Sequence, residues 1–373
     1  MKIAINTRFL LADKIEGIGR FSYEIAKRIV EQHPDDEFFF FFDRPFDESF
    51  IFEKNVKPIV LSPPARHPFL WYLWFEFAVA RALKKHKIDV FFSPDGYLSL
   101  RSDVPTLMTI HDIAFVHYPD IISGLVSHYY RYFTPRFIEK ATHLTAVSQF
   151  VKEDIVQYYG ASSDKISVTY NACQSTYKPL SIDNQILIKN KFSGGKEYFF
   201  FVGAVHPRKN VHRLIAAFEA FKTATKSDKK LLLAGRFAWQ TGEVKDAFEK
   251  AKHQKDIHFL GYVKEDELPA LMASAFALTW VSLFEGFGIP LLEAMCCDVP
   301  ILTSDVTAMP EVVADAALCV SPTDIHSIAK GMQRLSEDNA FRQKLIANAR
   351  IRRQAFDWDI SAQIIWDDIQ KII

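Results

Sequence analysis

The chain has 373 residues, 49% of them hydrophobic, and its 45 Lys and Arg residues balance its 45 Asp and Glu residues. This length exceeds what a single hydrophobic core usually serves, so two domains are expected. A net charge of zero gives no chain-wide attraction to nucleic acid or to anionic lipid, so a nucleic-acid partner is not expected.

The cysteine pattern indicates a reducing compartment. Cys173, Cys296, Cys297 and Cys319 show no C-x-x-C spacing, which fits neither a zinc site nor a disulfide framework. A strand pattern starts at Lys2 without a signal-peptide pattern, and no uncharged apolar run approaches the roughly 20 residues of a membrane span. The sequence therefore predicts a cytoplasmic protein.

The first half alternates strand and helix patterns. A strand over 2–6 is followed by Gly17 and Gly19 at the start of a helix that runs to about Val30, and five phenylalanines predict a strand over 38–42. This order is similar to a dinucleotide-binding fingerprint. About ten residues separate the first strand from Gly17, however, which is too many for a tight pyrophosphate turn. An NAD-dependent oxidoreductase that uses the Gly17–Gly19 loop stays open as an alternative.

Two further features of the first half concern ligands and membranes. The aromatic segment 69–80 passes into the basic segment 84–87, and it favours a helix packed in the core. A helix in weak peripheral contact with the inner face of a membrane is the alternative. The predicted strand over 106–112 carries His111 near its carboxyl end, where ligands gather in parallel sheets. His111 is therefore a candidate ligand contact.

After a polar linker, the second half of the chain shows the same alternation of strand and helix patterns. A strand over 198–203 is followed by Arg208 and Lys209 at a strand-to-helix turn. Two cations at such a turn suit a diphosphate, although a solvated Arg-Lys pair is also common. The alternation of strands with helices predicts parallel sheets with helices on both faces.

The most informative stretch follows an apolar strand over 275–281. A glycine-bearing loop carries Glu285, and a helix is predicted to begin at Pro290 with Glu293 in its first turn. Unpartnered amides at a helix start form a seat for phosphate. Carboxylates on either side of this seat would accept hydrogen bonds from sugar hydroxyls, which suits a nucleotide-sugar. The alternative is an ordinary helix start with Glu285 solvated in the loop.

The run F-E-G-F-G-I-P-L-L-E-A-M over 284–295 resembles the signature of the family 4 retaining glycosyltransferases, because its glycines, proline and both acids match together. The resemblance implies an α/β protein of the GT-B fold, with two Rossmann-like parallel-sheet domains facing each other across a cleft. The expected parts are an N-terminal acceptor-side domain over 1–178, a nucleotide-sugar-binding domain over 179–355, and a C-terminal helix over 356–373 that returns to the first domain.

The resemblance also implies roles for single residues. Lys209 would bind the donor phosphates, Glu285 and His111 would orient the hexose, and Glu293 would hold the ribose hydroxyls. Many members carry an arginine where this chain has Ala204, and Arg208 is the candidate substitute. The remaining expected donor-binding residues are Gly17, Gly19, Arg208, Gly286, Phe287, Gly288, Leu291, Leu292, Arg236 and Val263.

The implied activity is transfer of a hexose, with retention at the anomeric carbon, from a nucleotide diphosphate-sugar to a hydroxyl of a saccharide or lipid-linked saccharide. The preferred donor is GDP-mannose, which would supply mannose for cell-surface polysaccharide synthesis. No cofactor and no metal are expected, because the D-W-D run over 357–359 precedes a terminal helix rather than following a mid-chain strand. A non-catalytic nucleotide-sugar-binding protein is a further alternative.

Overall fold

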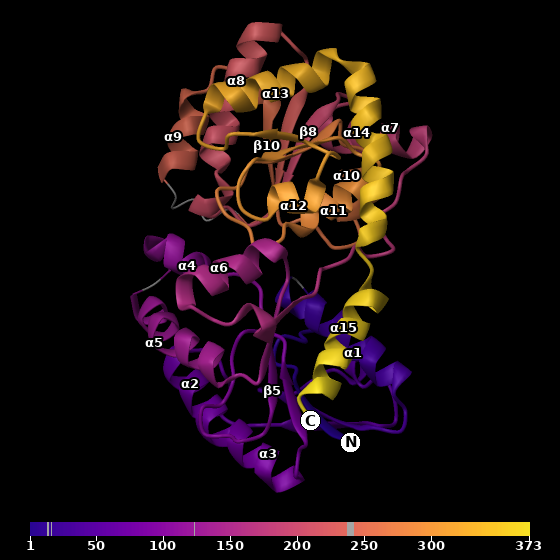
Figure 1. Ribbon diagram of the computed structural model, residues 1–373. Coiled ribbons are helices and arrows are strands. Elements are labelled where there is room, and N and C mark those ends of the chain that lie inside the picture. Colours follow the sequence, from indigo (N-terminus) through magenta and orange to yellow (C-terminus); the bar gives the residue numbers. More distant parts are fainter. Residues whose placement is uncertain (13–14, 16, 123, 237–241) are drawn as a thin grey trace. The chain divides into compact units, whose positions relative to one another are not determined.

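The computed structural model describes residues 1–12, 15, 17–122, 124–236 and 242–373 (Figure 1). The chain forms two compact units. The first consists of Met1–Asn171 together with Asp357–Ile373, and the second is Ala172–Phe356. Each unit contains one parallel β-sheet with helices packed on it, so the predicted α/β architecture with two parallel sheets is confirmed.

The first unit is built on a seven-stranded sheet with the order β3-β2-β1-β4-β5-β6-β7. The five phenylalanines over 38–42 are at most 4% exposed, because helices and loops cover both faces of a parallel sheet. Its strands are β1 (Lys2–Asn6), β2 (Glu37–Phe42), β3 (Val56–Val60), β4 (Val90–Ser93), β5 (Thr106–Ile110), β6 (His143–Ala146) and β7 (Ile166–Val168).

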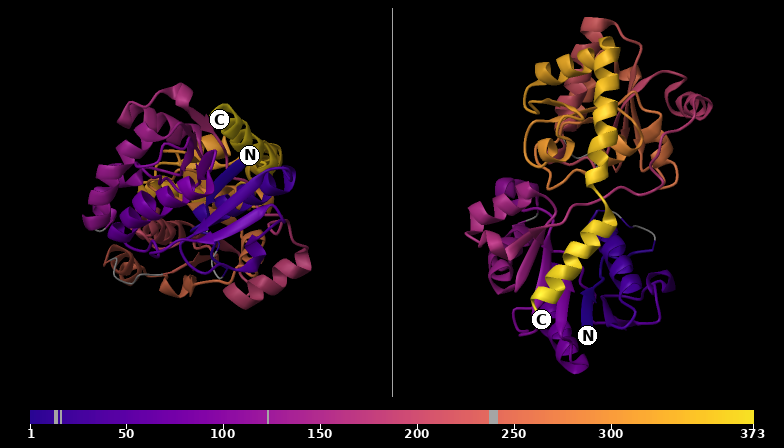
Figure 2. Two further views of the ribbon diagram at one scale, coloured as in Figure 1. Left: turned by 90° about the horizontal axis from the view of Figure 1, so that it is seen from below. Right: turned by 45° about the vertical axis from the view of Figure 1, so that its right-hand side comes forward.

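The helices of the first unit include one from the end of the chain. α15 lies beside α1, as Figures 1 and 2 show in yellow and indigo. The Arg28 guanidinium donates to Asp359 at 2.7 Å, and His33 stacks on Trp366 with ring centroids 3.5 Å apart. The helices are α1 (Ile18–Gln32), α2 (Pro68–Leu73), α3 (Ala80–His86), α4 (Ala114–His117), α5 (Gly124–Lys140), α6 (Gln149–Tyr159) and α15 (Trp358–Lys371).

The aromatic segment forms α2, a π-helical turn over Trp74–Val79, and α3. Its inner face is core, since the side chains of Trp74 and Phe75 are fully buried, whereas Phe69 is 63% exposed. None of the helices in the described part of the chain combines the length and apolarity that crossing a bilayer requires. Weak peripheral contact with a membrane stays a prediction.

The second unit is built on a six-stranded sheet with the order β10-β9-β8-β11-β12-β13. The strands are β8 (Tyr198–Val202), β9 (Lys230–Ala234), β10 (Ile257–Gly261), β11 (Ala277–Trp280), β12 (Ile301–Ser304) and β13 (Leu318–Val320). The helices are α7 (Ile182–Ser193), α8 (Val211–Thr225), α9 (Gly242–Lys250), α10 (Leu268–Ala273), α11 (Ile289–Cys296), α12 (Met309–Val313), α13 (Ile325–Glu337) and α14 (Asn339–Arg352).

Both sheets have the strand order of the doubly wound dinucleotide-binding fold, in which the direction of strand addition reverses next to the first strand. In the second unit this reversal falls between β8 and β11, which are parallel neighbours. The loops after these two strands therefore emerge together at the carboxyl edge of the sheet. This is the edge at which ligands bind in such sheets.

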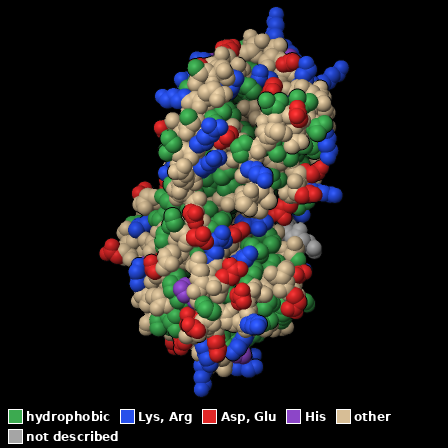
Figure 3. Space-filling view, turned by 90° about the vertical axis from the view of Figure 1, so that its right-hand side faces the viewer, with side chains coloured by type: hydrophobic (Ala, Val, Ile, Leu, Met, Phe, Trp, Pro, Cys, Tyr) green, Lys and Arg blue, Asp and Glu red, His purple; other side chains and the backbone are tan. Residues whose placement is uncertain are grey.

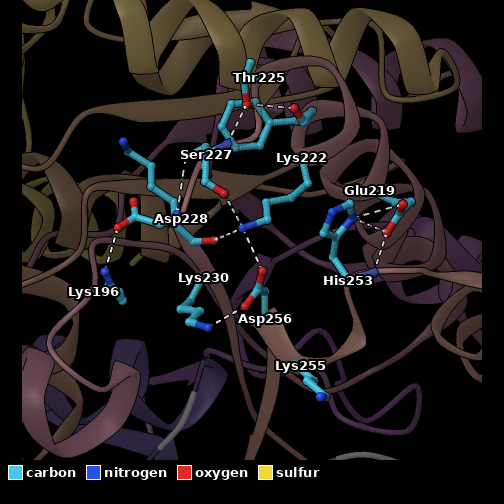
Figure 4. A network of polar contacts seen from close by, with 12 residues as sticks. Lys196, Glu219, Lys222, Thr225, Ser227, Asp228, Lys230, His253, Lys255 and Asp256 are labelled. Atoms are coloured by element: carbon cyan, nitrogen blue, oxygen red, sulfur yellow. Dashed lines mark hydrogen bonds and ion pairs between the residues drawn. The ribbon is translucent and has the colours of Figure 1, made fainter.

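The amino-terminal edge of the second sheet carries a separate network of charged side chains (Figure 4). Lys222 is only 4% exposed, and its ammonium lies 2.7 Å from the Asp256 carboxylate, which also pairs with Lys230. Lys196 pairs with Asp228 at 2.8 Å in the same region. The members of this network bond to one another at the starts of strands, which indicates a structural role.

Charges of both signs are interspersed over the face of the molecule shown in Figure 3. This distribution agrees with the equal numbers of basic and acidic residues in the sequence. It gives this face no broad field of one sign that would steer a polyanion toward it.

Two glycines allow the loops after β8 and β9 to approach closely. A Cβ on Gly235, whose φ is +142°, would lie 1.9 Å from the carbonyl oxygen of Gly203. We therefore expect Gly235→Ala to lower the free energy of unfolding by about 3 kcal/mol, through backbone strain and this clash. Urea denaturation followed by circular dichroism measures the change.

The matched control for this substitution is Gly242→Ala. A Cβ on Gly242 meets no heavy atom within 4 Å, and its φ is not in the left-handed region. We expect a change within about 0.5 kcal/mol for this variant. Equal stabilities of the two variants would contradict the close approach of the loops.

Candidate functional site

The centre of the candidate site is formed by the two loops at the β8–β11 reversal. The loop after β8 contains a 3₁₀ turn over Pro207–Lys209 and then enters α8. The loop after β11 carries Glu285 and leads to α11. Asn210, which is fully buried, donates to the carbonyl oxygen of Val281 at 2.9 Å and so fixes one loop against the other.

Glu285 links both loops through ion pairs. Its carboxylate accepts hydrogen bonds from the Lys209 ammonium at 2.6 Å and from the Arg208 guanidinium at 2.9 Å. Arg208 also donates to the carbonyl oxygen of Phe284 at 2.8 Å. Glu285 is only 6% exposed, so it is not solvated in the loop, contrary to the alternative considered above. The structure thus brings together three of the predicted residues.

The electrostatics of Glu285 follow from this arrangement. Burial alone would raise the pKa of its carboxyl, but the charges of Lys209 and Arg208 outweigh burial, and the pKa is lowered. The carboxylate is therefore ionised at neutral pH. Lys209 and Arg208 thus place two cationic groups at the strand edge, a type of charge that suits a phosphate group.

The start of α11 differs in detail from the prediction. The helix begins at Ile289, with Gly288 at the N-cap and φ of +94°, so Pro290 is its second residue. Pro290 has no N–H, and the N–H of Leu291 donates to the carbonyl oxygen of Gly288 at 3.0 Å. The helix start therefore offers fewer amides to an anion than the sequence predicted. Phe287, Leu291 and Leu292 are buried in the core of the unit.

Glu293 does not lie in the first turn of α11, which contains no acidic residue, so this detail of the prediction is wrong. It is the fifth helical residue because the helix starts one position earlier than expected. Its side chain is 8% exposed and lies beside Tyr177. Burial raises the pKa of the Tyr177 phenol, and the Glu293 carboxylate, which is hydrogen-bonded to it, raises it further.

The remaining predicted residues of the second unit follow β9 and β10. Arg236 is exposed, its guanidinium lies 5.7 Å from the Tyr262 ring centroid, and its backbone carbonyl accepts from the Val205 N–H at 3.0 Å. Val263 is half-buried directly after Tyr262. Gly286 is buried beside Glu285. All of these follow the carboxyl ends of strands of the same sheet, and their contact with a donor stays a prediction.

His111, Gly17 and Gly19 belong to the first unit. The His111 Nε2 lies 2.7 Å from the carbonyl oxygen of Pro94, to which it donates, and burial lowers the pKa of the imidazole. The ring is therefore neutral at pH 7, with Nδ1 as an acceptor.

The two glycines of the first unit lie at the start of α1. Gly17 is the N-cap, with φ of +48°, and a Cβ on Gly19 would lie 2.7 Å from the Phe9 carbonyl oxygen. The backbone conformation therefore favours glycine at position 17, and the close approach of the Phe9 carbonyl requires glycine at position 19. Residues 13–14 and 16 of the preceding loop lie outside the described residues.

Sequence reasoning missed a second buried ion pair. The guanidinium of Arg8, two residues after the end of β1, donates to Asp95 at 2.5 Å and lies 4.2 Å from the Tyr97 ring centroid. β1 and β4 are the neighbours at the strand reversal of the first sheet. The sequence signal that could have revealed this pair is the arginine two residues after the predicted first strand. Its acidic partner could be chosen only once the strand order was known.

The D-W-D run has a structural explanation. The Asp357 side chain caps α15 by accepting from the N–H groups of Asp359 and Ile360, and Asp359 pairs with Arg28. No group of three metal-ligating side chains occurs among the residues that the structure describes. Metal independence itself stays a prediction.

The Glu285 ion pairs predict a pH-dependent stability. Glu285→Gln removes the anion between two cations, so we expect the free energy of unfolding to fall by about 2 kcal/mol at pH 7. Because the folded-state pKa of Glu285 lies below the ordinary 4.5, the wild-type contribution is present above pH 4.5 and is lost as pH falls below it. Urea denaturation of both proteins across pH 3.5–7 should show the difference shrinking on the acid side.

The control is Glu249→Gln, which removes an exposed helical pair with Lys245. We expect at most about 0.5 kcal/mol for this variant at any pH. A Glu285→Gln protein as stable as wild type at pH 7 would show that the buried ion pairs contribute nothing to folding.

Comparison with known proteins agrees with this geometry. The family model described as Glycosyltransferase Family 4 matches residues 15–175, and the model described as Glycosyl transferases group 1 matches residues 183–352. O-antigen chain mannosyltransferase B of Escherichia coli is 29% identical over 364 residues, covering 92% of this chain and 93% of that protein. O-antigen chain mannosyltransferase RfbU of Salmonella typhimurium is 30% identical over 274 residues, covering 72% and 71%.

A solved structure supports the fold. The crystal structure of Anabaena HepE in complex with UDP and glucose matches with a TM-score of 0.77 at 19% identity, covering 100% of both chains. The expectation of a GT-B fold is confirmed. The two family models together with the Salmonella relative show that this chain belongs to glycosyltransferase family 4, the group 1 glycosyl transferases.

Proposed function

We propose that this glycosyltransferase moves mannose from GDP-mannose, with retention at the anomeric carbon, to a hydroxyl of a saccharide or lipid-linked saccharide in cell-surface polysaccharide synthesis. The observation that carries the proposal is the cluster of Lys209 and Arg208 around the buried Glu285 at the strand reversal. The similarity to O-antigen chain mannosyltransferases supports mannose as the hexose.

The cation cluster suits the departing diphosphate. Negative charge grows on the β-phosphate as the sugar leaves, and Lys209 and Arg208 can pair with that charge without being brought from solution. Glu285 keeps both cations close to one another before the phosphate arrives. A guanidinium offers two parallel N–H donors to phosphate oxygens. Arg208 can therefore take the place of the arginine that many family members carry where this chain has Ala204.

The sugar hydroxyls of the donor would be bound by the neutral His111 and the acidic Glu293. A neutral His111 whose Nδ1 is an acceptor suits a hydrogen bond from a hexose hydroxyl. Glu293, held beside Tyr177, keeps the proposed role of accepting from the ribose hydroxyls. We propose that no side chain serves as a glycosidase-like nucleophile and that the leaving phosphate acts as the base.

Transfer can be tested with the purified protein, GDP-mannose and a lipid-linked saccharide extracted from bacteria that make a mannose-containing surface polysaccharide. We expect mannose transfer, and NMR of the product should show the anomeric configuration of the donor. Lys209→Ala should lower kcat about 100-fold or more, because it removes a preorganised cation from the leaving group.

The control is Lys191→Ala, whose side chain is 59% exposed and pairs with Glu267. It should transfer mannose at the wild-type rate. Full activity of Lys209→Ala, or inversion at the anomeric carbon, would contradict the proposal. Titration of the wild-type protein with NAD and with GDP distinguishes the glycosyltransferase from the oxidoreductase alternative. The oxidoreductase alternative requires that NAD binds and that GDP does not bind.

Metal independence makes a separate prediction. If protein cations alone neutralise the diphosphate, transfer should continue at an unchanged rate in excess EDTA. Initial rates with and without EDTA, added in excess over any divalent metal in the assay, measure this. Loss of transfer with EDTA and its recovery with Mn²⁺ would contradict the prediction.

A further inference from the structure

Trp280 lies directly under the cation cluster. It is the last residue of β11, is 2% exposed, and forms a stacked pair with Phe201 whose ring centroids are 5.3 Å apart. The Lys209 ammonium lies 4.3 Å from the centroid of the indole ring. A cation at this distance over a ring face is attracted by the ring's quadrupole, most strongly by that of tryptophan.

Both loops of the site are shaped around this ring. A Cβ on Gly203, in the loop after β8, would lie 3.2 Å from Cη2 of the indole. A Cβ on Gly288, at the start of α11, would lie 3.8 Å from its Nε1. Glycine at position 203 therefore lets the backbone come close to the indole, whereas the distance at Gly288 is an ordinary van der Waals contact. The ring occupies the space between the cation side of the site and the helix start.

The indole N–H gives no reason for a tryptophan at this position. Nε1 is buried and has no hydrogen-bond partner among the described residues. An unpartnered buried donor costs about 1–3 kcal/mol, which phenylalanine would avoid. What tryptophan adds over phenylalanine is a larger and more negative ring face, and Lys209 lies over that face.

We propose that Trp280 is a positioning residue for Lys209. The ring face holds the ammonium at the strand edge, so that Lys209 keeps its place whether its hydrogen bonds go to Glu285 or to a donor phosphate. This inference rests on the proposed function, because it assumes that a nucleoside diphosphate binds beside Lys209. Trp280 touches neither the sugar nor the reacting atoms in this account, and its effect on the ligand passes through Lys209.

A double-mutant cycle tests the inference. GDP, UDP, ADP and dTDP are titrated calorimetrically into the wild-type protein, and the one that binds most tightly is used with Trp280→Leu, Lys209→Ala and the double variant. We expect Trp280→Leu to weaken binding about fivefold in the wild-type background, as a cation–π contact of this kind allows. In the Lys209→Ala background the same substitution should change binding less than twofold.

A structural role for Trp280 would give a different result. If the indole only fills space, its replacement should weaken binding by the same factor with and without Lys209, and such additivity overturns the inference. Phe199→Leu is the control, because Phe199 is a fully buried ring of β8 that packs on Phe218, Phe221 and Phe276 instead. It should leave binding within twofold of wild type.

Two further outcomes are informative. If Trp280→Leu does not fold, Trp280→Phe replaces it in the same cycle and should show coupling of the same sign and smaller size. If the wild-type protein binds none of the four nucleoside diphosphates, the proposed function and the inference both fail. Tight binding of GDP with an additive cycle leaves the proposed function standing and overturns the role of Trp280 alone, whereas tighter binding of another nucleoside diphosphate contradicts GDP-mannose as the donor.

Discussion

The second unit depends on one buried carboxylate that holds two cations. Glu285 lies in the loop after β11, and its partners Arg208 and Lys209 lie in the loop after β8, more than seventy positions earlier in the chain. A buried charge is tolerated only when it is paired, so the loop after β11 is fixed to the loop after β8 wherever the carboxylate stays ionised. Lys209 and Arg208 are thereby set in place before any ligand binds, which is the condition for electrostatic preorganisation.

The same device occurs in the first unit at the corresponding strands. Arg8 follows β1 and pairs with Asp95 after β4, and both sheets reverse their strand order between the first and fourth strands. A strand reversal leaves two loops that diverge from a shared edge of the sheet. In the second unit the Leu283 N–H donates to the Arg208 carbonyl oxygen at 2.7 Å, and in both units an ion pair adds a side-chain link between the loops. The Arg8 pair is almost fully buried, whereas Arg208 and Lys209 are partly exposed and so able to meet a ligand.

Much of this fold was predictable, because strands and helices alternate with clear apolar patterns and the motif around Glu285 is specific to one family. The partner of Glu285 was not predictable from local pattern, since it depends on which strands become neighbours. The position of Glu293 was misjudged by a single residue, because Pro290 is tolerated at the second helical position as well as at the first. The sequence pattern indicates only that Trp280 is a buried strand residue, and the structure is needed to show the Lys209 ammonium over its ring.

The cluster also explains why two different cations are useful at one site. If a phosphate binds here, it shares the donors of Lys209 and Arg208 with Glu285, and because both cations are already largely removed from water, their desolvation adds little to the cost of binding. An ammonium can turn between two acceptors because its three donors rotate, and a ring face beneath it attracts it without fixing a direction. A guanidinium is planar and holds its donors in a fixed fork, which suits Arg208 to keeping Phe284 and Glu285 in register. Lys209 is then the member of the pair that changes its hydrogen-bond partner while its ammonium stays over the Trp280 ring, and Arg208 is the member that preserves the loop.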